Sequence, residues 1–143
     1  MMTYYFDMDG TIADLYGIEN WLDYLLKEDT YPYEKARPLV DCEKLRKIME
    51  KKKLEGYSFG IISWTSKKGT KEYNKKVRKS KLAWLEKYFP DCFSEIHIIK
   101  YGTPKHWVAK NHGILFDDEE PNRKKWNKGM SYSEKEIFIQ LED

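Results

Sequence analysis

The sequence lacks the features that would tie this chain to a membrane, an oxidising compartment or a zinc site. Its two cysteines, Cys42 and Cys92, are too few for a disulfide framework. No apolar run approaches the roughly 20 residues that a membrane helix needs, and no charged leader with an apolar core precedes the first apolar segment. The three histidines show no metal-ligand spacing. We therefore expect a cytosolic protein with reduced thiols.

Repeats, low-complexity tracts and linkers are also missing from the chain. Its length of 143 residues lies within the roughly 100–200 residues of a typical domain, and a chain of this size can bury about two-thirds of its unfolded surface. We expect one domain over residues 1–143. The net charge of +2 does not by itself indicate a class of partner.

The most informative segment that is present lies near the start of the chain. A short apolar run at residues 4–6 leads into a turn that carries Asp7 and Asp9. Because the chain leaves the pleat at the end of a strand, both carboxylates can face one cleft. Gly10 permits backbone angles closed to other residues, and Thr11 can hold the turn by a local hydrogen bond. The segment is typical of a loop that holds charge.

Two other interpretations of this segment are a plain surface turn and an EF-hand loop. A lone Asp-Gly usually marks a surface turn. An EF-hand would need Gly and Glu where this chain has Ile12 and Ile18, so a calcium loop of that kind is excluded. The choice between a surface turn and a functional loop depends on the rest of the chain.

Apolar segments alternate with helical patterns through the rest of the chain. Further strands are predicted at residues 58–63, 95–99, 113–116 and 129–132. Helices are predicted at residues 18–29 and 41–54, between the basic stretch and Pro90, and at 134–141, with a helical turn at 105–110. This alternation indicates an α/β fold, a three-layer, doubly wound (Rossmann-like), mostly parallel sheet of about five strands. Residues 14–56 contribute only a small helical cap insertion, two helices and an irregular link. Ser133 and Glu136 predict a capping box for the last helix.

A second acidic segment follows the predicted strand at 113–116 and begins with Asp117 and Asp118. Ligands of such sheets bind beyond the carboxyl ends of the strands, where this segment would meet Asp7 and Asp9. Each close pair of like charges costs about 4 kcal/mol at about 4 Å and an effective dielectric near 20. A bound cation is the simplest way to reduce this repulsion between the carboxylates. Ligation by carboxylate oxygens, with positions left for water and phosphate, favours Mg²⁺ over Zn²⁺.

Taken in order, these motifs resemble the haloacid dehalogenase (HAD) superfamily of phosphotransferases. The matching features are Asp-Met-Asp-Gly-Thr after an apolar strand, a strand ending in Ser63, a downstream lysine, and a strand ending in Asp117-Asp118. The first and fourth matches are specific, whereas the other two are weak alone. The resemblance implies that Asp7 is a nucleophile that forms an aspartyl-phosphate, and that Asp9 is the general acid/base. The pKa of Asp9 would then lie above the usual value of about 3.9.

The resemblance also implies roles for the remaining motif residues. Ser63 corresponds to the hydroxyl that binds the phosphoryl group, with Thr65 as the alternative. Lys105 is our choice for the lysine that neutralises developing charge, with Lys81 and Lys100 as alternatives. For Mg²⁺, the implied ligands are Asp7, the backbone carbonyl of Asp9, and Asp118, while Asp117 assists through water.

Substrate specificity in this superfamily often comes from a cap, and here only residues 14–56 are available for one. An open or lightly covered site is implied, which could accept a phosphorylated small molecule, a nucleotide or a phosphorylated nucleic-acid end. The stretch 67–81 holds eight basic residues and one acidic residue, a local charge of +7. It could attract phosphates or be a solvated helix face. The aromatic residues that could line the site are Tyr16, Trp21, Tyr31, Tyr33 and Trp64.

The predicted function is Mg²⁺-dependent hydrolysis of a phosphomonoester through Asp7. One alternative is a non-catalytic module that keeps the fold and a Mg²⁺ or phosphate site, although the intact pair of Asp7 and Asp9 disfavours it. Another is a phosphoacceptor receiver domain, which would need its phosphorylated Asp on a middle strand. This chain has Ser63 at that position, so the receiver domain ranks last.

Overall fold

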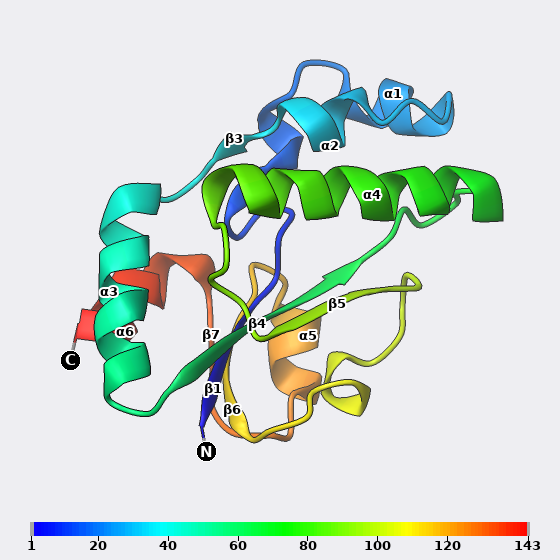
Figure 1. Ribbon diagram of the computed structural model, residues 1–143. Helices are drawn as coiled ribbons and strands as arrows, with labels where there is room; N and C mark the ends of the chain where they lie inside the picture. The colour runs from blue at the N-terminus through cyan, green and yellow to red at the C-terminus, as the bar shows by residue number, and fades with distance from the viewer. Residues whose placement is uncertain (1, 143) are drawn as a thin grey trace.

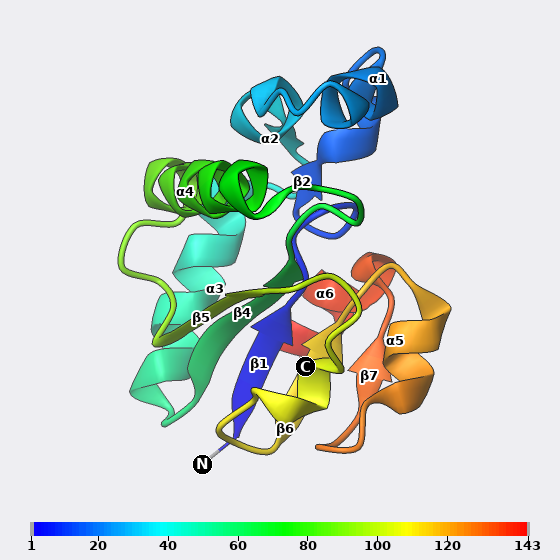
Figure 2. The same ribbon diagram turned by 90° about the vertical axis from the view of Figure 1, so that its right-hand side faces the viewer.

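A computed structural model describes residues 2–142 and shows an α/β fold built on one five-stranded, all-parallel sheet (Figure 1). The strands are β1 (Thr3–Phe6), β4 (Ser58–Trp64), β5 (Glu95–Ile99), β6 (Gly113–Phe116) and β7 (Ser131–Tyr132). Their order in space is β5-β4-β1-β6-β7. Figure 2 shows them between α3 (Cys42–Leu54) and α4 (Lys71–Tyr88) on one side and α5 (Glu120–Lys125) on the other. The predicted doubly wound, Rossmann-like fold is confirmed.

The central strand β1 is buried on both faces, which explains its continuous apolar sequence. Tyr4 and Phe6 point into a core formed with α3 and α4 and with the C-terminal helix α6 (Ile137–Glu142). Tyr5 points to the other face, where it packs with Leu115 and Trp126. Because β1 lies between β4 and β6, the carboxyl ends of these three strands meet at one edge of the sheet.

Helix α4 (Lys71–Tyr88) is the longest in the described chain and crosses the sheet beneath the cap insertion. Thr70 is its N-cap, since the hydroxyl accepts a hydrogen bond from the Tyr73 backbone N–H at 3.1 Å. The helical spacing of Val77, Leu82, Leu85, Tyr88 and Phe89 predicts an apolar stripe on this helix. The prediction is confirmed at Val77, Leu85 and Phe89 but wrong at Leu82, which is exposed, while Lys81 lies on the buried face one turn beyond Val77.

The cap insertion contains more regular structure than predicted. Its elements are β2 (Ala13–Asp14), the 3₁₀ turn η1 (Leu15–Gly17), α1 (Trp21–Leu26), α2 (Tyr31–Lys35), β3 (Arg37–Pro38) and α3 (Cys42–Leu54). Strands β2 and β3 pair as an antiparallel ribbon that was not predicted. The segment around Pro32 forms α2 instead of an irregular break, because proline in the first helical turn needs no backbone N–H. Helix α3 begins where predicted, with Asp41 accepting from the Lys44 N–H.

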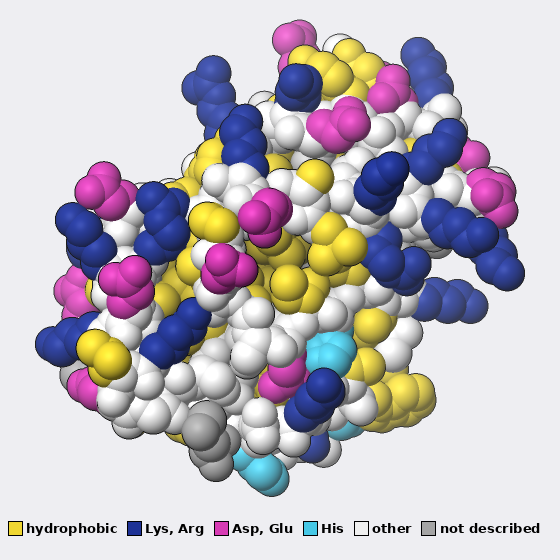
Figure 3. Space-filling view, viewed as in Figure 1, with side chains coloured by type: hydrophobic (Ala, Val, Ile, Leu, Met, Phe, Trp, Pro, Cys, Tyr) yellow, Lys and Arg dark blue, Asp and Glu magenta, His cyan; other side chains and the backbone are white. Residues whose placement is uncertain are grey.

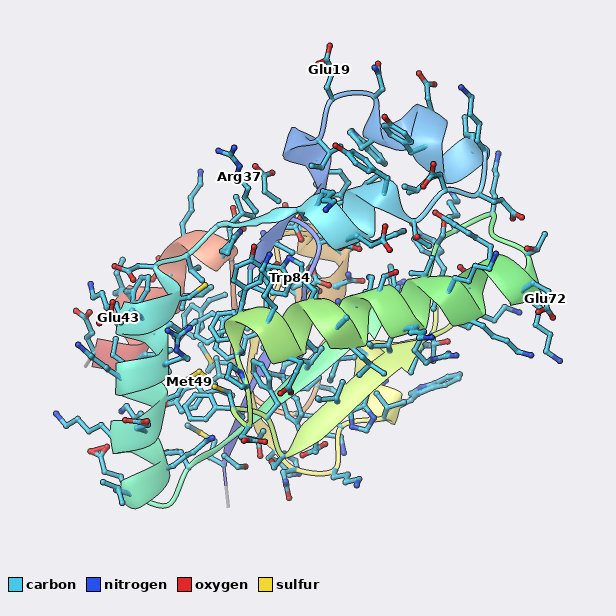
Figure 4. All side chains as sticks on the ribbon, turned by 45° about the horizontal axis from the view of Figure 1, so that its top comes forward. Glu19, Arg37, Glu43, Met49, Glu72 and Trp84 are labelled. Atoms are coloured by element: carbon cyan, nitrogen blue, oxygen red, sulfur yellow. The ribbon has the colours of Figure 1, made fainter. Side chains whose placement is uncertain are left out.

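Figure 4 shows how side chains attach these helices to the core. Trp84 lies between α4 and the segment entering α3, and its indole N–H donates to the Ala36 carbonyl at 2.8 Å. Met49 points from α3 toward the sheet, while Glu43 and Glu72 point to solvent. Apolar contacts and hydrogen bonds, this buried one among them, therefore hold the cap insertion on α4.

The C-terminal region differs from the prediction in detail. The acidic segment continues into a short helix, α5 (Glu120–Lys125), and the last helix is a 3₁₀ turn, η3 (Glu134–Glu136), followed by α6 (Ile137–Glu142). The predicted capping box is wrong: the Ser133 side chain makes no capping hydrogen bond, and its backbone carbonyl accepts from the Glu136 N–H. Within residues 2–142, none of the helices has the length and apolar character required to cross a membrane.

Candidate active site

The turn after β1 places Asp7 at the carboxyl edge of the sheet. The Asp7 N–H donates to the Phe116 carbonyl at 2.9 Å, which continues the pairing of β1 with β6 beyond the last strand residue. Gly10 has φ of 82°, and a Cβ there would collide with the carboxylate of Asp118. Only glycine fits this position, because a side chain would be strained and would also push the two acidic loops apart.

Lys105 links the two acidic loops. It comes from η2 (Lys105–Trp107), the turn that follows β5, and it is 5% exposed. Its Nζ lies 2.9 Å from Oδ1 of Asp7 and 2.7 Å from Oδ2 of Asp117. Burial disfavours its charge, but the two carboxylates outweigh burial and raise the pKa of Lys105 above its usual value. Lys105 is therefore a cation beside the predicted nucleophile. Lys100, one of its alternatives, is exposed.

Asp117 is fully buried and its carboxylate is already surrounded by donors. Besides Lys105, it accepts hydrogen bonds from the Glu119 backbone N–H at 2.9 Å and from the Asn122 amide at 3.1 Å. Burial raises its pKa, and the charge of Asp7 adds to the rise. Such a carboxylate positions Lys105. Asn122 was not predicted as a site residue, because nothing in its local sequence distinguishes it from other residues of α5.

Asp118 and Asp7 share the hydroxyl of Thr11. Thr11 Oγ1 lies 3.1 Å from Oδ2 of Asp7 and 3.2 Å from Oδ1 of Asp118, and it also accepts from the Asp118 N–H. A hydroxyl has one proton, so it can donate to only one of these carboxylates at a time. Burial and the neighbouring Asp7 raise the pKa of Asp118. The carboxylates of Asp7 and Asp118 therefore repel each other, and the single hydroxyl proton of Thr11 does not neutralise them both.

One carboxylate oxygen from each of Asp7, Asp117 and Asp118 can be chosen so that all three lie within 4.8 Å of one another. This spacing and an all-oxygen ligand set suit a hard divalent cation such as Mg²⁺. A cation between Asp7 and Asp118 would also relieve the repulsion that Thr11 cannot. The cluster brings together three of the four predicted metal-site residues, and the carboxylate of Asp9 is not part of it.

Asp9 faces a second buried lysine instead. Lys81, 1% exposed, places its Nζ 2.8 Å from Oδ2 of Asp9, 2.8 Å from Oγ of Ser63 and 2.7 Å from the carbonyl oxygen of Trp64. Burial raises the pKa of Asp9 above its usual value, the charge of Lys81 opposes this rise, and the charge of Asp7 adds to it. Sequence analysis proposed one lysine for the site, and the structure brings two to it.

A cavity of about 600 Å³ opens above these residues, a size typical of small-molecule sites. Asp7, Asp9 and Lys105 are among the residues that line it. Thr65 lines the cavity, whereas Ser63 is enclosed beside Lys81 and is not part of the lining. Of the two hydroxyls left open by the sequence, Thr65 is therefore the one that borders the cavity.

The cap insertion supplies much of the cavity wall. The predicted aromatic residues that line it are Tyr16, Trp21, Tyr33 and Trp64. Tyr31 is not among them and packs against Tyr24, with ring centroids 4.9 Å apart. Of the predicted basic stretch, Lys67 and Lys68 line the cavity and Lys81 lies beneath it. The other basic residues of the stretch lie along α4, outside the cavity lining.

Comparison of the chain with family models and with curated proteins found no match. The chemistry of the site therefore rests on its geometry. A buried carboxylate, Asp7, borders a cavity beside a lysine and an oxygen-rich cluster suited to a divalent cation. A second carboxylate, Asp9, lies two residues away with a raised pKa. This arrangement can supply a nucleophile, a proton carrier and positive charge to one ligand.

Proposed function

We propose that this protein is a Mg²⁺-dependent phosphomonoester hydrolase of the HAD-like kind, which acts through an aspartyl-phosphate on Asp7. The observation that carries the proposal is the position of Asp7 in the cavity wall, between Lys105 and Thr11 and beside Asp118. A nucleophile that attacks a phosphate dianion needs nearby positive charge, and this site provides a buried lysine and room for a cation.

In the first proposed step, a carboxylate oxygen of Asp7 attacks phosphorus and the bond to the leaving oxygen breaks. Asp9, which lines the cavity two residues from Asp7, gives a proton to the leaving oxygen; burial raises its pKa and the charge of Lys81 opposes that rise. In the second step Asp9 takes a proton from water, the water oxygen attacks phosphorus, and Asp7 is released with inorganic phosphate. Lys105 neutralises charge on the transferring group, and the hydroxyl of Thr65 binds one of its oxygens.

The residues that would hold Mg²⁺ are Asp7 and Asp118, with the backbone carbonyl of Asp9. When bound there, the ion would neutralise charge on the carboxylates and on the phosphoryl oxygens. Asp117 holds Lys105 in place through its 2.7 Å ion pair. Thr11 fixes the distance between the two acidic loops.

The proposed substrates are phosphorylated small molecules, nucleotides or nucleic-acid end phosphates, because the cavity is lined by aromatic residues and lysines. A cytosolic location, expected from the cysteine content, belongs to the same proposal.

The test is phosphate release, with and without Mg²⁺, from sugar phosphates, 5′- and 3′-nucleotides and phosphorylated oligonucleotides. Asp7→Asn is the blank, and loss of the nucleophile should lower turnover by roughly 10³-fold or more. Asp23→Asn, an exposed change on α1 outside the cavity lining, is a matched control. Phosphate release that requires both Mg²⁺ and Asp7 would support the proposed hydrolase. If folded protein that still binds Mg²⁺ releases phosphate from none of these substrates, the result would favour the non-catalytic binding module.

A further inference from the structure

One wall of the cavity is a continuous series of cation and ring contacts that starts beside Asp7. The Nζ of Lys105 lies 5.3 Å from the ring centre of Trp64, and the rings of Trp64 and Tyr101 are 4.8 Å apart. At the far end, the Nζ of Lys67 lies 5.8 Å from the ring of Tyr101. The indole N–H of Trp64 donates to the Thr103 carbonyl at 2.8 Å, which fixes its ring in place. The wall is thus aromatic in the middle and cationic at both ends.

The cap insertion provides apolar side chains for the same cavity. Leu22 and Leu26 of α1 line it although they are 51% and 62% exposed, and Leu25 and Trp21 lie beside them. Large apolar side chains exposed around one cavity are typical of a ligand site. A flat ring stacked on Trp64 and Tyr101 would cover part of this surface, because aromatic faces favour stacked or tilted ring partners.

The lysines at the outer end of the wall are available to a ligand. Across residues 2–142, no carboxylate oxygen lies within 4.0 Å of the Nζ of Lys67 or Lys68. Glu28, which also lines the cavity, is engaged by Thr70: it accepts from the Thr70 N–H at 2.8 Å and from the hydroxyl at 3.0 Å. The first turn of α4 is therefore already capped, and an anion at this end would be bound by the two lysines.

The basic surface continues outward from these lysines. Figure 3 shows Lys and Arg side chains gathered on the right-hand side of the molecule, around the N-terminal end of α4. The exposed members along the helix are Lys71, Lys75, Lys76, Arg78 and Lys79. A ligand that extended beyond the cavity would meet more positive charge along this face.

From this order of charges and rings we propose that the cavity binds a nucleotide that carries a second phosphate. The phosphate to be removed lies at Asp7, the base stacks on Trp64 and Tyr101, and the second phosphate binds Lys67 and Lys68. This inference rests on the proposed function for the first phosphate only. A sugar phosphate would leave the aromatic wall bare, and a nucleoside monophosphate would leave the outer lysines without an anion. The second phosphate can belong to a free nucleoside bisphosphate or to the next link of a strand.

The test measures binding to the Asp7→Asn protein, which cannot turn the ligands over. The three probes are deoxyribose 5-phosphate, thymidine 5′-monophosphate and thymidine 3′,5′-bisphosphate. Stacking of one base should tighten binding by about 5- to 150-fold from the first probe to the second. We expect a further gain of about fivefold or more for the bisphosphate. Equal affinity for all three probes would overturn the proposal.

Three variants assign these gains to residues. Tyr101→Ala should remove most of the gain due to the base, and Lys67→Gln with Lys68→Gln should remove the gain due to the second phosphate. Lys47→Gln with Lys51→Gln, on α3 and outside the cavity lining, changes the charge equally and should keep both gains. If the α3 variant loses the second gain as completely as the cavity variant, the lysines are not a specific subsite and the proposal fails.

A 5′-phosphorylated tetranucleotide separates the two sources of the second phosphate. Tighter binding than the bisphosphate, with loss of the extra affinity in Lys75→Gln with Lys79→Gln, would assign the site to a strand along α4. Affinity equal to that of the bisphosphate would assign it to a free nucleotide, and either result supports the subsite. If the unmodified protein turns substrates over but the affinity gains are absent, the hydrolase proposal is supported and the subsite proposal is wrong. If the affinity gains are present but the unmodified protein shows no turnover, the subsite is supported and the hydrolase proposal is wrong.

Discussion

Lys81 places its Nζ 2.8 Å from Oδ2 of Asp9, although the two residues are 72 positions apart in the sequence. Lys105 makes the equivalent contact with Asp7 at 2.9 Å. One lysine arrives on α4, after β4, and the other on η2, after β5. Each carboxylate of the opening motif therefore has its own buried cation. This separate neutralisation allows two acids, two residues apart, to lie together at the edge of the sheet.

The first prediction concerns Lys105. Lys105→Met should lower the free energy of unfolding by about 3–5 kcal/mol, because Asp7 and Asp117 would lose their shared buried cation. Turnover should fall by roughly 10²-fold or more. Urea denaturation and initial rates measure the two effects. Lys100→Met, an exposed change five residues earlier, should alter neither. A larger loss of activity in the Lys100 variant would reassign the catalytic lysine.

The second prediction concerns Lys81. Lys81→Met should also cost about 3–5 kcal/mol of unfolding free energy, because the Asp9 side chain, only 19% exposed, would lose its buried partner. Adding Asp9→Asn removes that charge and should restore part of the loss. Denaturation of the two single variants and the double variant measures the coupling. Lys79→Met, exposed on the same helix, is the control. Additive losses in the double variant would mean that the pair is not coupled.

The third prediction concerns the metal. Mg²⁺ should stabilise the protein, by about 2.7 kcal/mol at a hundredfold excess over its dissociation constant. Asp118→Asn should reduce the rise in melting temperature on Mg²⁺ addition, and in metal-free protein it should not destabilise, because it relieves repulsion with Asp7. Glu120→Gln, exposed on α5, is the matched control. An equal Mg²⁺ effect in both variants would place the ion elsewhere.

The fourth prediction is a pH dependence of stability at Glu95, the first residue of β5, which is not part of the carboxylate cluster of Asp7, Asp117 and Asp118. Burial disfavours its charge, but hydrogen bonds from the His97 ring, the Lys110 N–H and the Tyr5 hydroxyl outweigh burial and hold the pKa of Glu95 below its usual value. A lowered pKa in the folded state stabilises the protein above the unfolded-state pKa of roughly 4.3, and this stabilisation is lost as the pH falls through the folded-state value.

Glu95→Gln should therefore lower the free energy of unfolding by about 1–3 kcal/mol at neutral pH, with a smaller difference from the unmodified protein below about pH 4. Urea denaturation at several pH values measures this difference. Glu86→Gln, exposed on α4, should show little difference at any pH. A difference for Glu95→Gln that grows as the pH falls would contradict the direction of the shift.

The fold could be predicted from the sequence because its signals are local. Apolar runs such as residues 58–63 and 113–116 are too continuous for half-exposed strands, and helical spacing separates them. The acids of the site could be located for the same reason, since Asp7 and Asp117 directly follow such runs. Their meeting at one edge follows from parallel strands, whose carboxyl ends lie on the same side of a sheet.

The partners of these acids were decided by the tertiary structure. Lys81 belongs to a basic stretch, and only the packing of α4 turns it inward while its neighbours remain in solvent. Ser63 and Thr65 are two residues apart, yet Ser63 is enclosed beside Lys81 and Thr65 borders the cavity. The sequence by itself determined which strands end in acids. Which lysine meets which acid depends on contacts between distant segments, and local spacing does not encode them.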